Sequence, residues 1–166
     1  MPISIKTLYQ RALQLCAKLA WLGPLAVRVV VGIAFMITGW GKLTNLAKVT
    51  GYFESLHIPL AGPQAAMVST IEFVGGLLLI VGLGTRIVSL LLIGVMTVAI
   101  LTAKLGEADG FVDFLTSLPT TIELTYLVTF VWLLLGGAGP ASIDHLIARR
   151  GQDSSQLPRP GVNPAH

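Results

Sequence analysis

Four long runs of apolar residues, separated by short polar segments, dominate the chain. They cover approximately residues 25–40, 64–82, 87–103 and 121–137. Each run approaches the roughly 20 mostly apolar residues that a helix needs to cross a bilayer. The runs lack the polar outer faces that the helices of a soluble four-helix bundle would need. The pattern therefore predicts an all-α, polytopic membrane protein built as a four-transmembrane-helix bundle.

A different pattern precedes the first run. Between residues 3 and 21, apolar side chains recur at helical spacing on one face, which favours an amphipathic helix. Three basic residues lie off that face: Lys6, Arg11 and Lys18. Such a helix is expected to lie on anionic lipid, and a frayed basic tail is the alternative. We expect an interfacial helix at 1–22, the membrane domain at 23–148 and a disordered C-terminal tail at 149–166.

The composition supports a membrane protein and narrows its chemistry. Charged residues make up 11% of the chain, against about 25% in an ordinary soluble domain. Cys16 is the single cysteine, so no intrachain disulfide or thiolate cluster can form. No histidine lies within a long apolar run, and no nucleotide-binding fingerprint is found. We therefore expect no intrinsic cofactor, no metal site and no nucleic-acid partner, and a bound quinone remains open.

Basic residues in the segments between the runs predict the orientation of the chain. If both termini are cytoplasmic, seven Lys and Arg lie inside and three lie outside. The inner set is Lys6, Arg11, Lys18, Arg86, Arg149, Arg150 and Arg159, and the outer set is Lys42, Lys48 and Lys104. This excess on the inside follows the positive-inside rule. We expect a multi-pass protein of a bacterial inner (plasma) membrane with both termini in the cytoplasm.

Two acidic residues fall within the apolar runs, at matching places in two similar hairpins. Glu72 and Glu123 each follow a Thr-Ile pair, and Lys42 and Lys104 end the preceding runs. Counted from residue 64, Glu72 lies about 12 Å from the outer start of its helix. A carboxylate at this depth is expected to face the bundle interior and to find a basic partner.

These charges predict an outer-leaflet polar cluster that could bind a quinone head group or another small polar molecule. Its candidate residues are Glu72, Lys42, Glu123, Lys104, Trp40 and Tyr126, with Tyr52 nearby. The alternative is structural: Lys–Glu pairs hold the helices together, the lysines extend to the interface, and Trp40 belongs to the aromatic belt.

Arg28 lies a short way inside the first run and has two interpretations. It either extends to the inner lipid phosphates or forms a buried structural pair with Asp144. In the second case it would pack the C-terminal helix under the bundle. Ser142 is expected to cap that short helix, with Asp144 in its first turn, after residues 137–140 end the fourth run.

The chain resembles the DoxX family of small four-helix membrane proteins over about residues 25–148. The resemblance rests on Arg28 with the segment VVVGIAFMITGWGKL, on Glu72-Phe-Val-Gly-Gly-Leu, on Gly82-Leu-Gly-Thr-Arg86 and on Gly137-Ala-Gly-Pro-Ala-Ser-Ile-Asp144. It implies a membrane component of a quinone-linked or stress-related oxidoreductase assembly. Any electrons would then pass through a bound quinone or a redox partner protein.

Three functions remain open at this point. The first is a membrane subunit that docks a redox partner and binds quinone near Glu72. The second is a non-enzymatic scaffold or assembly factor. The third is a proton or small-solute conductor, which is disfavoured because both intramembrane carboxylates lie toward one side. In none of the three does the chain carry a self-contained catalytic motif.

Overall fold

The computed structural model describes residues 5–104 and 110–155, and all the regular structure within them is helical. In chain order the elements are α1 (Ile5–Leu19), α2 (Leu22–Thr44), α3 (Leu46–Ser55), α4 (Ala61–Val81), α5 (Thr85–Ala99), the π-helical segment η1 (Ile100–Lys104), α7 (Phe111–Ser117), the 3-10 segment η2 (Leu118–Thr120), α8 (Ile122–Gly136) and α9 (Ile143–Ser155).

Three helical spans are long and apolar enough to cross a membrane: Leu22–Thr44, Ala61–Val81 and Thr85–Thr102. The fourth predicted span corresponds to α8, which is apolar but has only 15 residues. Pro119 in the preceding 3-10 segment and the extended backbone of Thr121 delay its start, and Gly137 ends it with a φ of 75°. The predicted all-α bundle of apolar helices is confirmed.

Helices α2 and α4 pack with their backbones in contact because glycines remove the intervening side chains. A Cβ added to Gly39 would lie 2.4 Å from the backbone nitrogen of Phe73, and one added to Gly76 would lie 2.5 Å from that of Met36. Small residues permit this close approach between membrane helices. This contact places the end of α2 directly beside the middle of α4.

The second helix pair is α5 and α8, and a central cluster joins it to the first pair. Phe35 of α2, Leu79 of α4, Leu92 of α5 and Phe130 of α8 are buried together. The rings of Phe35 and Phe130 meet edge to face with their centroids 5.0 Å apart. Edge-to-face contacts of this kind are favoured between aromatic rings.

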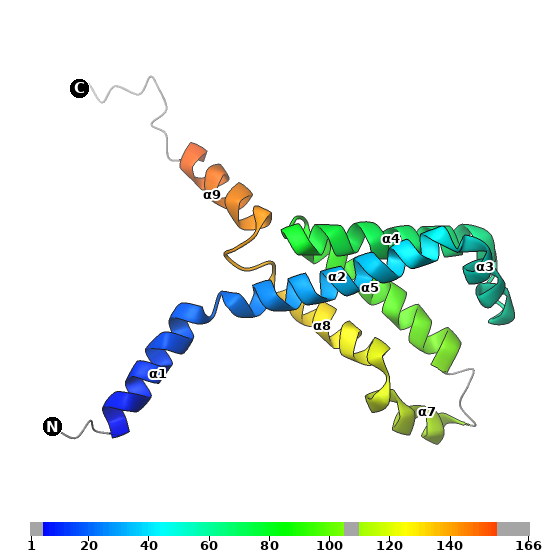
Figure 1. Cartoon of the computed structure of the whole chain (residues 1–166), viewed down its shortest axis with the longest axis horizontal. Coiled ribbons are helices and arrows are strands. Elements are labelled where there is room, and N and C mark those ends of the chain that lie inside the picture. The colour runs from blue at the N-terminus through cyan, green and yellow to red at the C-terminus, as the bar shows by residue number, and fades with distance from the viewer. Residues whose placement is uncertain (1–4, 105–109, 156–166) are drawn as a thin grey trace, which may run out of the picture.

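The two pairs are close together at one end of the bundle and diverge toward the other (Figure 1). At the end that we call the terminal end, α2 begins, α8 ends and a tight turn through Gly82 and Gly84 joins α4 to α5. Both glycines have positive φ, and Gly82 closes α4 with hydrogen bonds to Leu78 and Leu79, as in a helix C-cap. At the opposite end, the α3 end, α3 covers the space beside α4 (Figure 1).

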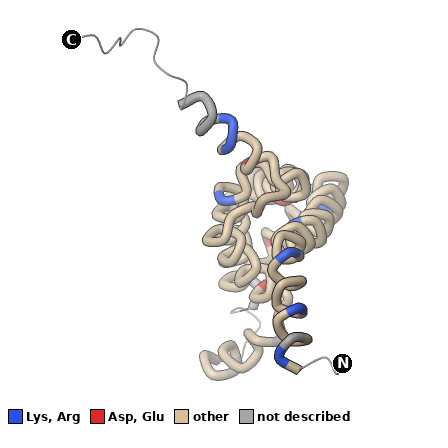
Figure 2. The backbone as a smooth tube through the Cα atoms, turned by 90° about the vertical axis from the view of Figure 1, so that its left-hand side faces the viewer, with Lys and Arg blue, Asp and Glu red and all other residues tan. Residues whose placement is uncertain are grey.

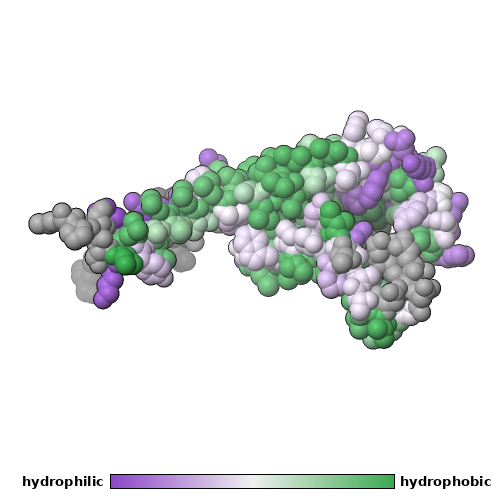
Figure 3. All heavy atoms as spheres, turned by 60° about the horizontal axis from the view of Figure 1, so that its bottom comes forward, coloured by the Kyte–Doolittle hydropathy of each residue, from purple (hydrophilic) through white to green (hydrophobic). Residues whose placement is uncertain are grey.

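On the face shown in Figure 3 the molecule is largely apolar across its middle, and polar residues gather toward its two ends. Helices α1 and α9 project from the terminal end, and both carry basic residues (Figure 2). The predicted amphipathic segment is helical in α1, with Ile5, Leu8 and Leu15 exposed on it. Helix α9 continues to Ser155, so residues 149–155 are helical where the sequence predicted a disordered tail. The rest of that predicted tail, 156–166, lies outside the described residues.

Candidate functional site

An ion pair joins α2 to α4 inside the bundle. The ammonium of Lys42, in the last turn of α2, lies 2.6 Å from Oε1 of Glu72. The side chain of Glu72 is 2% exposed and that of Lys42 is 39% exposed. Gly39 makes the pair possible because it lets the backbone of α4 approach α2 one turn before Lys42. Since α4 begins at Ala61, Glu72 lies about 16 Å along the helix, deeper than the sequence predicted.

The second carboxylate oxygen of Glu72 has no such partner. Oε2 is buried and makes no hydrogen bond to any described residue. Buried polar atoms are nearly always hydrogen-bonded, and an exception calls for a specific explanation. Leaving a buried charged acceptor unsatisfied costs free energy, because the atom loses its hydration without gaining a donor. The carboxylate is therefore only half satisfied by the protein.

Glu72 also lines a cavity of about 570 Å³ between α3, α4 and α5. Lys42, Tyr52 and Glu123 line the same cavity, so the structure brings these predicted cluster residues together. Most other lining residues are apolar, among them Val49, Phe53, Leu56, Met67, Val68, Ile71, Leu91, Val95, Met96 and Val98. A mostly apolar cavity with a few convergent polar groups is typical of a small-molecule site.

The structure places two other predicted cluster residues, Trp40 and Tyr126, away from the cavity. Trp40 is 56% exposed and packs against Phe73, with ring centroids 5.5 Å apart, and it does not line the cavity. Tyr126 packs against Phe35 at a centroid distance of 5.0 Å and contributes to the core. Lys104 ends the π-helical segment, and its side chain lies outside the described residues.

The two intramembrane glutamates are not equivalent, although the sequence places them in similar hairpins. Glu72 is near the middle of its helix and almost fully buried. Glu123 is in the first turn of α8 and only partly buried. A carboxylate in a first helical turn is favoured by the helix dipole without any basic partner. Glu72 has no such help from a helix end, so it depends on Lys42 for one oxygen and lacks a donor for the other.

Sequence reasoning missed one wall of the cavity, which α3 supplies. Residues 46–55 lie between the first two apolar runs, where the hydropathy pattern predicts no transmembrane helix. Val49, Tyr52, Phe53 and Leu56 line the cavity, and their spacing of i, i+3, i+4 and i+7 is the signal of an amphipathic helix.

The π-helical segment that follows α5 is also close to the cavity, through Thr102. Such segments are often found at functional sites, but sequence alone does not predict them.

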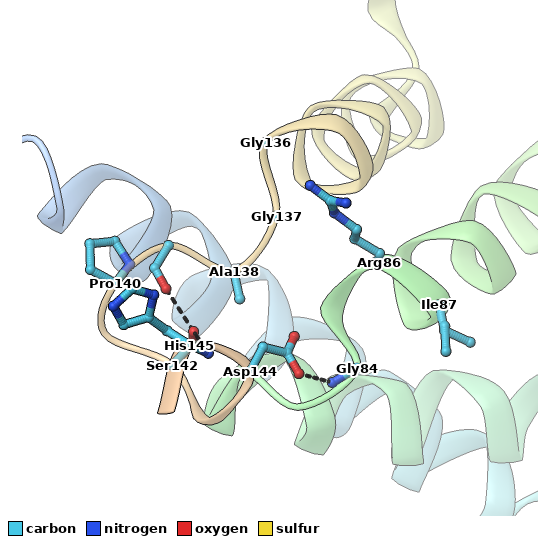
Figure 4. Close-up of a pocket in the computed structure, with 11 residues that line it drawn as sticks. Gly84, Arg86, Ile87, Gly136, Gly137, Ala138, Pro140, Ser142, Asp144 and His145 are labelled. Carbon is cyan, nitrogen blue, oxygen red and sulfur yellow. Dashed lines mark hydrogen bonds between the residues drawn. The ribbon is translucent and has the colours of Figure 1, made fainter. Parts of the chain in front are cut away.

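A second, shallower cavity of about 650 Å³ lies at the terminal end (Figure 4). Two of its polar residues, Asp144 and Ser142, already make hydrogen bonds within the protein. Both carboxylate oxygens of Asp144 accept hydrogen bonds, from the backbone N–H of Gly84 at 2.7 Å and of Thr85 at 2.9 Å. Ser142 accepts the N–H of His145 at 3.2 Å, which is the predicted cap of α9. Arg86 lies beside Gly137 at the end of α8 (Figure 4), where a cation is favoured.

Arg28 and Asp144 hold this junction together, but not by bonding each other. Arg28 is 1% exposed, and its guanidinium donates to the backbone carbonyl of Ala138 and, at 2.8 Å, to that of Ala141. Asp144 instead binds the first N–H groups of α5, which point along the helix axis toward it. Arg28 thus neither extends to lipid nor makes a hydrogen bond to Asp144, and the two residues make separate contacts. Both attach the segment after α8 to the bundle.

Other buried polar atoms do not indicate a second ligand site. Nε of Arg28, Oγ1 of Thr85 and Oγ of Ser89 are buried without a partner among the described residues. None of these three residues lines either of the two cavities. Within the described ranges, His, Cys, Asp and Glu side chains do not gather in groups of three or more that could hold a metal ion. Among the residues that the structure describes, Glu72 is the one that combines a buried, unpartnered side-chain atom with either of these two cavities.

Comparison with known proteins gives a consistent set of relatives. The DoxX family model matches residues 23–105. The chain is 34% identical over 133 residues to the "Inner membrane protein YqjF" of Escherichia coli, covering 80% of this chain and 98% of that protein. It is 36% identical over 127 residues to the "Putative oxidoreductase CatD" of Bacillus subtilis, covering 76% of this chain and 87% of that protein.

A third relative is an uncharacterized membrane protein of Mycobacterium tuberculosis, 29% identical over 135 residues, which cover 76% of this chain and 82% of that protein. No solved structure matches the chain. The family model covers α2 to α5, and the relatives are named as membrane proteins or, in one case, as a putative oxidoreductase.

Proposed function

The chain belongs to the DoxX family of membrane proteins, and we propose that it is a membrane subunit of a quinone-linked oxidoreductase assembly. The cavity beside Glu72 is assigned to the quinone head group. The observation that carries this proposal is the buried, half-satisfied carboxylate of Glu72 at the wall of a mostly apolar cavity. The name of the Bacillus subtilis relative supports the oxidoreductase part.

The size and chemistry of the cavity fit a quinone head group. Its volume of about 570 Å³ lies within the roughly 300–1,000 Å³ that is usual for small-molecule sites. Tyr52 and Phe53 provide aromatic surface for a flat ring, and Met67 and Met96 add flexible apolar surface. Lys42 keeps two further N–H donors beside the one given to Glu72.

The residues of this chain bind and orient, and we assign electron transfer to a partner. A quinone, when bound, supplies a carrier of two electrons and two protons. Lys42 would donate a hydrogen bond to an oxygen of the ring, and Glu72 would accept a hydrogen bond from a hydroxyl group of the reduced ring. The sequence contains a single cysteine and no flavin fingerprint, so we assign the electron donor or acceptor to a redox partner protein.

Native mass spectrometry of the full chain extracted with its membrane lipids tests this function, because it reports bound quinone and bound protein together. Gly94→Leu should fill the cavity, since Gly94 lines it and an added Cβ meets nothing within 4 Å. Gly41→Leu is the matched control, because Gly41 is equally open but does not line the cavity. We expect quinone on the wild type and on Gly41→Leu, and at least a tenfold lower occupancy on Gly94→Leu.

Three outcomes would contradict the proposal. If no quinone is found on the wild-type protein, the proposal that quinone is the ligand is wrong. If both leucine variants carry equal amounts of quinone, the cavity is not its binding site. A stable protein partner without any quinone would support the assembly-factor role instead.

A further inference from the structure

The hydrogen-bonding capacity of the Glu72 cavity distinguishes the two redox forms of a quinone. This step rests on the function proposed above. An ionised carboxylate only accepts hydrogen bonds, and a quinone carbonyl also only accepts them. A hydroquinone carries two hydroxyl groups, each of which both donates and accepts. We propose that the cavity prefers the reduced, hydroxyl-bearing form of its ligand over the oxidised form.

The argument begins with the two oxygens of Glu72. Oε1 receives the ammonium of Lys42 at 2.6 Å, and Oε2 is buried without a donor. The terminal torsion of a glutamate side chain is broad, so Oε2 can turn toward a donor in the cavity at little cost. A hydroxyl group on the ligand supplies that donor, and a quinone carbonyl does not. The carbonyl would instead place one acceptor against another.

Lys42 does not reverse this preference. Its remaining donors can reach an oxygen of either redox form, because both a carbonyl and a hydroxyl accept hydrogen bonds. Lys42 therefore contributes to affinity for both forms, whereas Glu72 contributes only to affinity for the hydroxyl-bearing form. Sites built to hydrogen-bond a substrate hydroxyl discriminate strongly against analogues that lack it, since the buried group is then left unpaired.

The other polar residues of the cavity do not supply a competing donor at the same depth. Glu123 is a second acceptor, and Gln64, in the first turn of α4 and two turns before Glu72, donates one of its two amide N–H groups to the carbonyl of Pro59 at 2.7 Å. Lys48 is exposed on α3. Tyr52 is 51% exposed, which places it toward the mouth. The main polar atom in the buried part of the cavity is thus Oε2 of Glu72, an acceptor without a donor.

Binding of one soluble probe in its two redox forms tests this inference. The full chain in lipid nanodiscs is titrated under anaerobic conditions with 2,3-dimethoxy-5-methyl-1,4-benzohydroquinone and, separately, with the corresponding benzoquinone. We expect the wild type to bind the hydroquinone at least tenfold more tightly. Glu72→Gln should lower that ratio to one or below, because the amide N–H₂ donates to a carbonyl.

Glu54→Gln is the matched control, since it makes the same change of charge at an exposed position of α3 that does not line the cavity, and it should keep the wild-type ratio. If neither form of the probe binds the wild type, the proposed function fails. If both bind with a ratio of one, or the benzoquinone binds more tightly, the redox preference fails and the proposed function stands. If a folded Glu72→Gln protein keeps the wild-type ratio of the two affinities, Glu72 is not the cause of the preference. The wild-type ratio needs no variant and decides the preference even if Glu72→Gln does not fold.

Discussion

Arg28 and Glu72 are both almost fully buried charges in the same bundle, but their surroundings differ. Arg28 is 1% exposed and donates to two backbone carbonyls of the segment after α8. Glu72 is 2% exposed, has one partner on a half-exposed lysine, and lines a cavity with its second oxygen unpartnered. The protein thus supplies most of what Arg28 needs, whereas it leaves an acceptor open at Glu72.

This difference separates a structural charge from a candidate binding charge. At the terminal end, Arg28 and Asp144 attach the C-terminal segment to α2 and α5 through backbone groups. Removing either should therefore lower stability. Toward the α3 end, the helices diverge and leave a cavity beside Glu72. Changing this residue should affect ligand binding more than folding.

The largest loss of stability is expected for Arg28→Met. Methionine replaces the aliphatic part of the arginine side chain but lacks the guanidinium, so the carbonyls of Ala138 and Ala141 lose their charged donor. We expect the free energy of unfolding in mixed detergent micelles to fall by about 3 kcal/mol. The control Arg86→Met, at an exposed position, should change it by less than about 0.5 kcal/mol. Equal stability of the two variants would contradict a structural role for Arg28.

A smaller loss is expected for Gly82→Ala, and Gly84→Ala separates its two causes. Both glycines have positive φ, at 70° and 60°, so alanine at either costs about 1 kcal/mol in backbone strain. At Gly82 the new Cβ would also lie 2.7 Å from the guanidinium carbon of Arg28, whereas at Gly84 it meets nothing within 4 Å. Chemical denaturation should show Gly82→Ala to be at least about 1 kcal/mol less stable than Gly84→Ala. Identical midpoints would show that Arg28 is loosely packed there.

Asp144→Asn is expected to have a moderate effect. Asparagine offers one acceptor oxygen, so one of the two N–H groups at the start of α5 loses its partner. We expect a loss of about 1 kcal/mol, which is typical of a removed helix cap. The control Glu54→Gln, at an exposed site of α3, should have the same free energy of unfolding as the wild type in the same denaturation experiment. A loss in both variants would point to net charge and not to capping.

The smallest effect on stability is expected at Glu72 itself. In Glu72→Gln the amide oxygen can still accept the ammonium of Lys42, so the contact between α2 and α4 is kept. We expect the free energy of unfolding to change by less than about 1 kcal/mol. A larger loss than that of Arg28→Met would show that the Lys42–Glu72 pair is mainly structural, and it would reverse the comparison.

The sequence predicted the features that depend on local pattern. Apolar runs and glycines indicated the helices, Gly137 and Ser142 marked the end of α8 and the cap of α9, and the depth of Glu72 indicated a buried carboxylate with a lysine partner. These signals follow from hydropathy, helix geometry and capping, which act over a few residues.

Features that depend on how the helices diverge were not predictable in the same way. The sequence grouped Trp40 and Tyr126 with Glu72, but helix rotation places one toward the surface and the other in the core. For Arg28 the sequence left two interpretations, an extension to the lipid phosphates and a pair with Asp144. The structure gives each charge backbone partners instead, and these become visible only when the turn after α8 is placed.

The most direct test of this contrast is the rise in Tm that the benzohydroquinone probe causes in three proteins: wild type, Gly82→Ala and Glu72→Gln. A ligand that binds only the folded state stabilises it by about 2.7 kcal/mol at a concentration of 100 times its Kd. We expect Gly82→Ala to have a lower Tm without probe but a rise equal to that of the wild type. Glu72→Gln should have a Tm near that of the wild type without probe and should lose most of the rise. An equal rise in wild type and Glu72→Gln, or its loss in Gly82→Ala alone, would contradict the account.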